Sequence, residues 1–186
     1  MHQVIGEEPA VPGLEPAQHG DRDGAIARYK LALDALPANI TAAQGLRNAY
    51  LARGDAASAV EVVCQQIELE DGKLAKARLY CDLAELQRDK LKDPAAAREA
   101  AVKASDLDGT NIGALLVLGD IAFEAESFVE ASTHYGSLAN RIEALDQDVG
   151  KLVLMRYIDA LARSGSTEKA LSSVDALLER ADNDPK

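Results

Sequence analysis

Five alanines, each set in the same local pattern, recur along the chain at spacings of 34, 38, 34 and 39 residues. They are Ala25, Ala59, Ala97, Ala131 and Ala170. A period near 34 with helical spacing inside it is the signature of helix-turn-helix repeats. A single unit of this kind cannot bury its apolar face alone, so the units stack. The sequence therefore predicts an all-α fold, an α-solenoid of stacked antiparallel helix pairs, with an extended binding surface rather than a catalytic pocket.

Two further columns keep the same register. Five residues before the alanines stand Gly20, Gly54, Glu126 and Gly165, with Asp93-Pro94 filling that place in the third copy. Further upstream stand Leu46, Leu83, Leu118 and Tyr157, followed by Arg47, Ala84, Gly119 and Ile158. Small residues in the last column allow two helix axes to approach closely. We expect the recurrent alanines to lie at the same contacts.

These columns resemble the tetratricopeptide repeat, which combines a Leu-Gly/Ala pair with small and aromatic residues at fixed later positions. The best copy runs from Ile112 to Glu143 and contains Leu118-Gly119, Phe128, Ala131 and Tyr135. The resemblance covers roughly Gly20 to Asp182 and implies a right-handed superhelix. The sequence from Ala77 to Asp108 resembles that of bacterial proteins of this family, which implies a bacterial source.

The register predicts the organisation of the chain. Residues 1–19 are rich in Pro, Gly and Glu and should form an irregular lead-in. The solenoid should span 20–182, with a half repeat at 20–37, full repeats at about 40–71, 74–109, 111–143 and 148–182, and a tail at 183–186. The predicted helices are Asp23–Leu36, Thr41–Ala52, Ala56–Leu69, Leu74–Asp89, Pro94–Ser105, Asn111–Ala125, Phe128–Ile142, Asp148–Arg163 and Thr167–Ala181.

Residues typical of catalysis or metal binding are sparse. The histidines His2, His19 and His134 stand far apart, without cysteine or carboxylate partners at ligand spacing. Cys64 and Cys81 do not form a CxxC pair and are expected to be small apolar fillers. Neither a nucleophile–base ordering nor a phosphate-cradling glycine loop stands out. We therefore expect no catalytic, cofactor-binding or metal-binding residue, and no enzyme activity.

Charge and hydropathy narrow the partners. The formal net charge is −11, whereas nucleic-acid binding requires a basic surface; we expect no nucleic-acid partner. Without an apolar run of about 20 residues the chain should not insert into a membrane, and its first residues lack the pattern of a secretory signal. These features favour a cytoplasmic location.

The resemblance implies that first helices line a concave groove that holds partners. The expected groove residues are the acidic Asp82, Glu85, Asp120 and Asp159, the apolar Leu116, Phe123 and Met155, and Asn48, Arg78 and Arg156. The carboxylates predict steering of a basic segment, and the apolar side chains predict an anchor beside it.

Some members of the family grip a terminal carboxylate with a Lys-Asn, Asn, Lys-Arg arrangement across three repeats. Here Asn48 matches one position, but Gln44 replaces the Lys and Asp82 the second Asn. Gly113 and Val117 stand in place of the Lys-Arg pair. This departure disfavours a carboxylate clamp.

Two function hypotheses follow. The first is a protein-interaction scaffold that binds a peptide or helical segment of a partner in its groove. The alternative is a structural segment of a longer repeat array, or a module that self-associates through uncapped terminal helices, because terminal repeats of solenoids normally carry polar caps.

Overall fold

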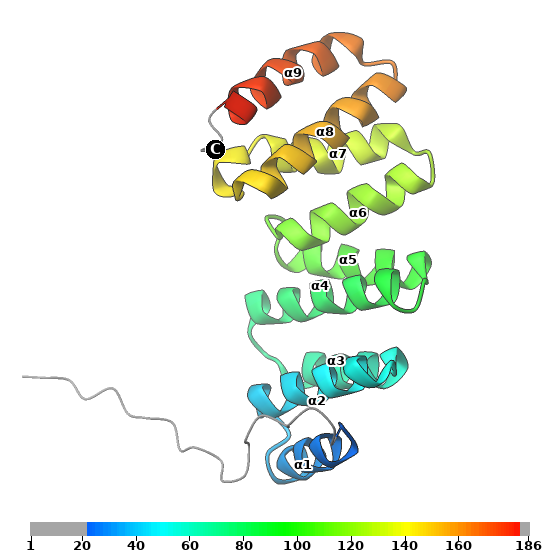
Figure 1. Cartoon of the computed structure of the whole chain (residues 1–186), viewed down its shortest axis with the longest axis vertical. Coiled ribbons are helices and arrows are strands. Elements are labelled where there is room, and N and C mark those ends of the chain that lie inside the picture. The colour runs from blue at the N-terminus through cyan, green and yellow to red at the C-terminus, as the bar shows by residue number, and fades with distance from the viewer. Residues whose placement is uncertain (1–21, 183–186) are drawn as a thin grey trace, which may run out of the picture. The chain divides into compact units, whose positions relative to one another are not determined.

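The computed structural model describes residues 22–182, which contain nine α-helices, one short 3₁₀ helix and no strand (Figure 1). The helices are α1 (Arg22–Ala35), α2 (Ile40–Arg53), α3 (Ala56–Leu69), α4 (Lys73–Asp89), α5 (Pro94–Leu107), α6 (Ile112–Glu124), α7 (Phe128–Ala139), η1 (Ile142–Ala144), α8 (Gln147–Arg163) and α9 (Thr167–Asp182). The expected lead-in and tail, 1–19 and 183–186, lie outside the described residues. The predicted all-α fold of helix pairs is confirmed.

The chain divides into two compact units, Met1–Val62 and Val63–Lys186. In the first, α1 packs against α2, and the shared core contains Ile26, Leu46, Tyr50 and Val62. In the second, α4 pairs with α5, α6 with α7 and α8 with α9, and α5 and α7 also contact the first helix of the next pair. Figure 1 shows α4 to α9 following one another in chain order.

Asparagine and aspartate side chains begin many of these helices. Asn39, Asp93, Asn111 and Asp146 each accept a hydrogen bond from the backbone N–H three residues later, at 2.9–3.0 Å. Such N-caps satisfy backbone donors that have no partner within the helix. Since each cap stands directly before the helix that it begins, local sequence explains why the predicted starts agree with the structure to within one residue at these four helices.

The recurrent alanines are all buried, as the register predicts. Gly119, also buried, shows why a small residue is needed on α6: a Cβ at this position would lie 2.6 Å from the ring of Tyr135 on α7. At the next helix–helix contact, between α7 and α8, the ring of Tyr157 on α8 lies over Gly136 of α7. Two glycines thus let tyrosines fill the space between successive helices of the second unit.

One predicted boundary was wrong. Helix α7 was expected to continue to Ile142, but it ends at Ala139 and is followed by the 3₁₀ turn Ile142–Ala144. The last turn tightens as the Arg141 N–H donates to the carbonyl of Leu138 at 2.9 Å. This change of direction lets Leu145 enter a core cluster with Leu138. Apolar burial therefore ends the helix earlier than its own pattern predicts.

The turn inside each helix pair contains a residue with left-handed backbone: Gly54 (φ 84°), Lys92 (φ 57°), Glu126 (φ 58°) and Gly165 (φ 82°). Lys92, rather than the expected Asp93-Pro94, takes this place in the third copy. The next residue then donates its N–H to a carbonyl near the end of the first helix, as Ser127 does to Ala122 at 2.8 Å. Left-handed conformation is strained for residues that carry a Cβ.

Replacing Glu126 with Gly should therefore stabilise the chain by about 0.5–1 kcal/mol, because the gain from released strain exceeds the added flexibility of the unfolded chain. Glu126→Ala is the matched control, since it removes the charge but keeps the Cβ. In urea unfolding Glu126→Gly should gain stability relative to Glu126→Ala, and Gly165→Ala should lose about 1 kcal/mol. Equal stability of the two Glu126 variants would contradict the assignment of strain.

Candidate functional site

The expected groove residues lie on four first helices. Asn48 is exposed on α2 in the first unit. The other nine lie on α4, α6 and α8 of the second unit, where α4 contacts α6 directly. We use the name first-helix surface for the following residues of these three helices: Arg78, Asp82, Glu85, Arg88, Leu116, Asp120, Leu152, Met155 and Arg156.

Asp120 of α6 forms ion pairs with arginines of both α4 and α8. Its Oδ2 accepts a hydrogen bond from Arg88 of α4 at 3.0 Å, and its Oδ1 pairs with Arg156 of α8. The hydroxyl of Tyr135 also donates to Oδ1, at 2.6 Å. Because the Asp120 side chain is only 16% exposed, these partners replace the water that it lacks. Asp120 therefore holds the first helices together instead of presenting an unpaired charge to a partner.

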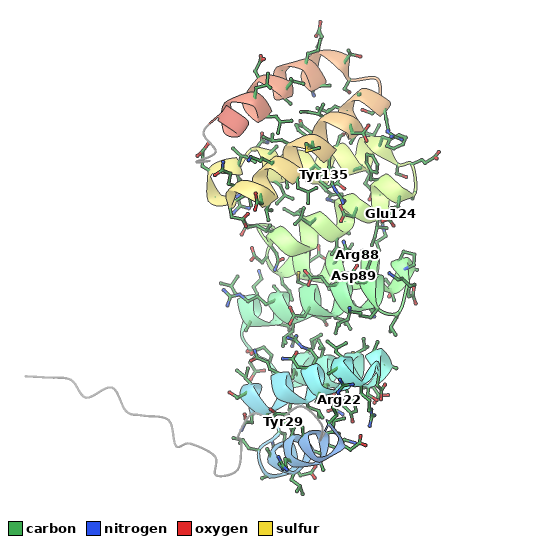
Figure 2. The ribbon with its side chains drawn as sticks, viewed as in Figure 1. Arg22, Tyr29, Arg88, Asp89, Glu124 and Tyr135 are labelled. Atoms are coloured by element: carbon green, nitrogen blue, oxygen red, sulfur yellow. The ribbon has the colours of Figure 1, made fainter. Side chains whose placement is uncertain are left out.

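The surroundings of Tyr135 and Arg88 in this network raise the pKa values of both side chains. Burial and the hydrogen bond to Asp120 raise the pKa of Tyr135 well above its usual value, so that its hydroxyl stays protonated. The hydrogen bond to Asp89 raises the pKa of Arg88. Figure 2 labels Arg88 and Asp89 on α4 and Tyr135 on α7. The two arginines of the network thus stay charged, and its tyrosine stays a hydrogen-bond donor, across the neutral pH range.

Glu85 lies in a different environment, one repeat before Asp120 in the same column. Its carboxyl accepts a weak hydrogen bond from the thiol of Cys81 at 3.7 Å, and it lies 3.2 Å from where a Cβ of Gly113 would be. Partial burial, then the charge of Asp82, raise the pKa of Glu85. Burial, followed by the charge of Glu85, raises the pKa of Cys81 to about 12, so that this thiol is inert. Glu85 is therefore a carboxylate whose charged form is disfavoured by burial and by Asp82 and is favoured by Arg88, which is itself hydrogen-bonded to Asp89 and Asp120.

Apolar side chains are exposed beside these charges on α8. Met155 is 59% and Leu152 44% exposed. One repeat earlier, on α6, Leu116 is half-buried against the cluster around Leu138 and Val153. Met155 and Leu116 occupy equivalent positions, two residues before Tyr157 and Leu118 in their repeats. The exposed apolar part of the first-helix surface is therefore on α8.

Phe123 and Asp159, both expected in the groove, take part in contacts within the molecule. The Phe123 ring meets Phe128 edge to face, with centroids 5.4 Å apart. The guanidinium of Arg163 lies 5.3 Å from both ring centroids, and its Nε donates to Asp159 at 2.8 Å. This cation–aromatic cluster stabilises the end of α8 near the α6–α7 turn. Phe123 is thus half-buried and less accessible than Met155.

Sequence reasoning missed the role of Tyr135. It was recognised as part of the repeat pattern, but not as a donor to Asp120. A signal was present in the sequence, since Tyr135 and Tyr29 share a column, four residues after a recurrent alanine. The structure adds that both rings lie over a glycine, Gly119 and Gly45. Arg78, by contrast, is exposed on α4 as expected for a surface position.

Within residues 22–182, no group of three or more histidine, cysteine or acidic residues could hold a metal ion. None of the helices in this part of the chain combines the length and apolarity needed to cross a membrane.

Comparisons with known proteins bear on the fold. No protein-family model matches the chain, and no curated protein does. Among solved structures, it is similar to two crystal structures of MamA at 22% identity. The first has a TM-score of 0.69, and the match covers 88% of this chain and 90% of MamA. The second has a TM-score of 0.68, and the match covers 90% of this chain and 88% of MamA.

Two more distant similarities agree with these. A tetratricopeptide repeat protein from Parabacteroides merdae aligns at 14% identity and a TM-score of 0.58, covering 90% of this chain and 61% of that one. The Cut9–Hcn1 structure of the APC/C aligns at 15% identity and a TM-score of 0.59. The match covers 88% of this chain and 31% of that one. At these identities the likeness establishes the architecture: the chain has a tetratricopeptide-repeat-like fold, as the sequence pattern predicts.

Proposed function

We propose that this chain is a non-catalytic scaffold that holds a segment of a partner protein on the first-helix surface of α4, α6 and α8. The observation that carries the proposal is the exposure of Met155 and Leu152 beside the ordered charges of Asp120, Arg88 and Arg156. Interfaces gain most of their energy from a few apolar or aromatic anchors surrounded by polar groups. A surface of packed helices is also preorganised, so that little entropy is lost on binding.

Of the three apolar side chains that the sequence places in the groove, Leu116, Phe123 and Met155, the proposed anchor is Met155 and not Phe123. Phe123 is already stacked against Phe128 and covered by Arg163. Met155 and Leu152 present more accessible apolar area. The partner is therefore expected to place its apolar side chain on α8.

Selection from a random peptide display library against the whole chain tests this proposal. Selected peptides should lose at least about tenfold in affinity for the Met155→Glu variant, because a charge would then face the apolar side chain of the peptide. Val129→Glu is the matched control, since Val129 is exposed on the second helix α7 and the same charge is introduced. Peptides that bind both variants equally would place the site elsewhere.

A second candidate, self-association, is favoured by α9. This helix packs on α8, and its Leu171 and Leu178 are exposed. Two exposed leucines seven residues apart lie on one face of a helix. Sedimentation at rising concentration distinguishes the candidates: a monomer at all concentrations argues against self-association, and a dimer that Leu171→Glu dissociates argues for it.

A further inference from the structure

Resting on the proposed function, we infer that the partner segment is extended and bipartite: one lysine or arginine meets Glu85 on α4, and a large apolar side chain about five or six residues away meets Met155 and Leu152 on α8. This names the chemistry and the spacing of the partner. Three observations carry it, namely the pairing of the acids, the exposure of the apolar side chains and the packing of the helices.

The basic end of the segment follows from how the acids are paired. Glu85, Asp120 and Asp159 occupy one column, on α4, α6 and α8. Asp120 binds two arginines and Asp159 binds Arg163. Glu85 has no cationic partner within ion-pair distance among residues 22–182, and its hydrogen bond is to Cys81.

The surroundings of Glu85 favour a cation from outside. Asp82 lies three residues before it on the same helix, so the two carboxylates lie on one face. Asp82 destabilises the charged form of Glu85, and Arg88, which favours that form, is already paired with Asp89 and Asp120. A bound ammonium or guanidinium relieves this repulsion and forms a charge-assisted hydrogen bond. The net charge of −11 attracts a basic segment over a longer range.

The apolar end follows from exposure. Met155 and Leu152 are one turn apart on α8, and both are more than two-fifths exposed. Leu116 on α6 continues the apolar strip toward α4 but is half-buried. Methionine adapts to differently shaped partners because its side chain is unbranched and flexible. A single leucine, isoleucine or phenylalanine of the partner suits this site.

The spacing follows from the packing of the first helices. Helix α4 contacts α6, and Asp120 of α6 pairs with Arg156 of α8. Packed helices such as α4 and α6 lie about 8–10 Å apart. The Asp120–Arg156 ion pair is compatible with a similar distance between α6 and α8, which would separate α4 and α8 by about 16–20 Å. An extended chain rises about 3.3 Å per residue and covers this distance in about five or six residues.

A helical segment would need about 11–13 residues to cover the same distance. Helices of that length are marginal in water and need a continuous apolar face to bind. The first-helix surface offers two well-exposed apolar side chains, both on α8. The extended form is therefore the better match.

A series of fluorescent synthetic peptides tests the inference by anisotropy against the whole chain. Each peptide carries Lys-Lys at one end and Leu-Phe at the other, joined by Gly-Ser spacers of about two, five or twelve residues. The spacer of about five residues should bind about tenfold tighter than that of about two, which cannot span the sites, and severalfold tighter than that of about twelve. Its affinity should fall as salt is added.

The variants separate this inference from the proposed function. Glu85→Gln should remove most of the advantage of the five-residue spacer, whereas Glu124→Gln, an exposed acid on α6 that Figure 2 labels, should leave it intact. Equal affinity for all three spacers, or tighter binding of a twelve-residue alanine-rich helical spacer, would overturn the extended bipartite segment. If display-selected peptides bind at Met155 but lack a basic residue, the scaffold proposal stands and this inference fails. If no peptide binds at Met155, both fail.

Discussion

Replacing Tyr135 with Ala is expected to lower the free energy of unfolding by about 3–5 kcal/mol, the range for removing a buried aromatic side chain. Tyr135 is fully buried. Its neighbours in the core are Ala122, Ala131 and Ala160, whose side chains are too short to fill the space that the ring would leave. The ring also contacts Gly119. Urea unfolding of the whole chain, followed by circular dichroism, measures the loss.

Tyr135→Phe separates packing from hydrogen bonding. It keeps the ring but removes the donor to Asp120, so a loss of about 0.5–1.5 kcal/mol is expected. Similar losses for the Ala and Phe variants would mean that the hydroxyl, rather than the packed ring, carries the contribution. A loss below about 1.5 kcal/mol for Tyr135→Ala would show that α6 and α7 can close the cavity, against the packing described here.

Replacing Asp120 with Ala should destabilise the chain by about 2–4 kcal/mol. The change leaves Arg88 and Arg156 without their shared carboxylate and the Tyr135 hydroxyl without its acceptor. Removing one member of a fully buried pair costs about 3–5 kcal/mol. We expect less here because the Arg156 side chain is 39% exposed and can recover part of its hydration.

Asp106→Ala is the matched control for this variant, since Asp106 is an exposed acid on α5. Its effect should stay within about 0.5 kcal/mol. A double-mutant cycle between Asp120→Ala and Arg88→Ala should give a coupling energy of about 1 kcal/mol or more. Additive effects of these two changes would show that the α4–α6 ion pair contributes nothing to stability.

The stability and binding experiments address different side chains. Tyr135 and Asp120 hold α6, α7 and α8 in place, whereas Met155 and Glu85 are the residues of the first-helix surface proposed to contact a partner. Variants of Met155 and Glu85 should therefore unfold like the unmodified chain. This separation allows loss of binding to be interpreted as loss of contact.

Much of this fold could be predicted from local sequence. The recurrent alanines predicted which residues are buried between helices, and all five are. Caps such as Asn111 and Asp146 set helix starts by hydrogen bonds to donors three residues away. The end of α7 could not be predicted in the same way, because the burial of Leu145 beside Leu115 and Val153 determines it.

The candidate site was only partly predictable. Its helices and faces follow from the repeat register, so Glu85, Asp120 and Met155 could be placed on first helices from the sequence. The sequence could not show which of these acids form ion pairs and which do not. The same column contains Asp120, bound to two arginines, and Glu85, which lacks such a partner among the described residues.

The sequence by itself determined the helix pairs, the starts of the capped helices and the residues on each face, because these depend on interactions within a few residues along the chain. Only the tertiary structure decided which acids are neutralised and which apolar side chains remain accessible. Arg88 and Arg156 reach Asp120 from 32 and 36 residues away in the sequence. Coulomb interaction and hydrogen bonding fall steeply with distance in space, and the packing of α4 on α6 and of α8 on α7 sets that distance.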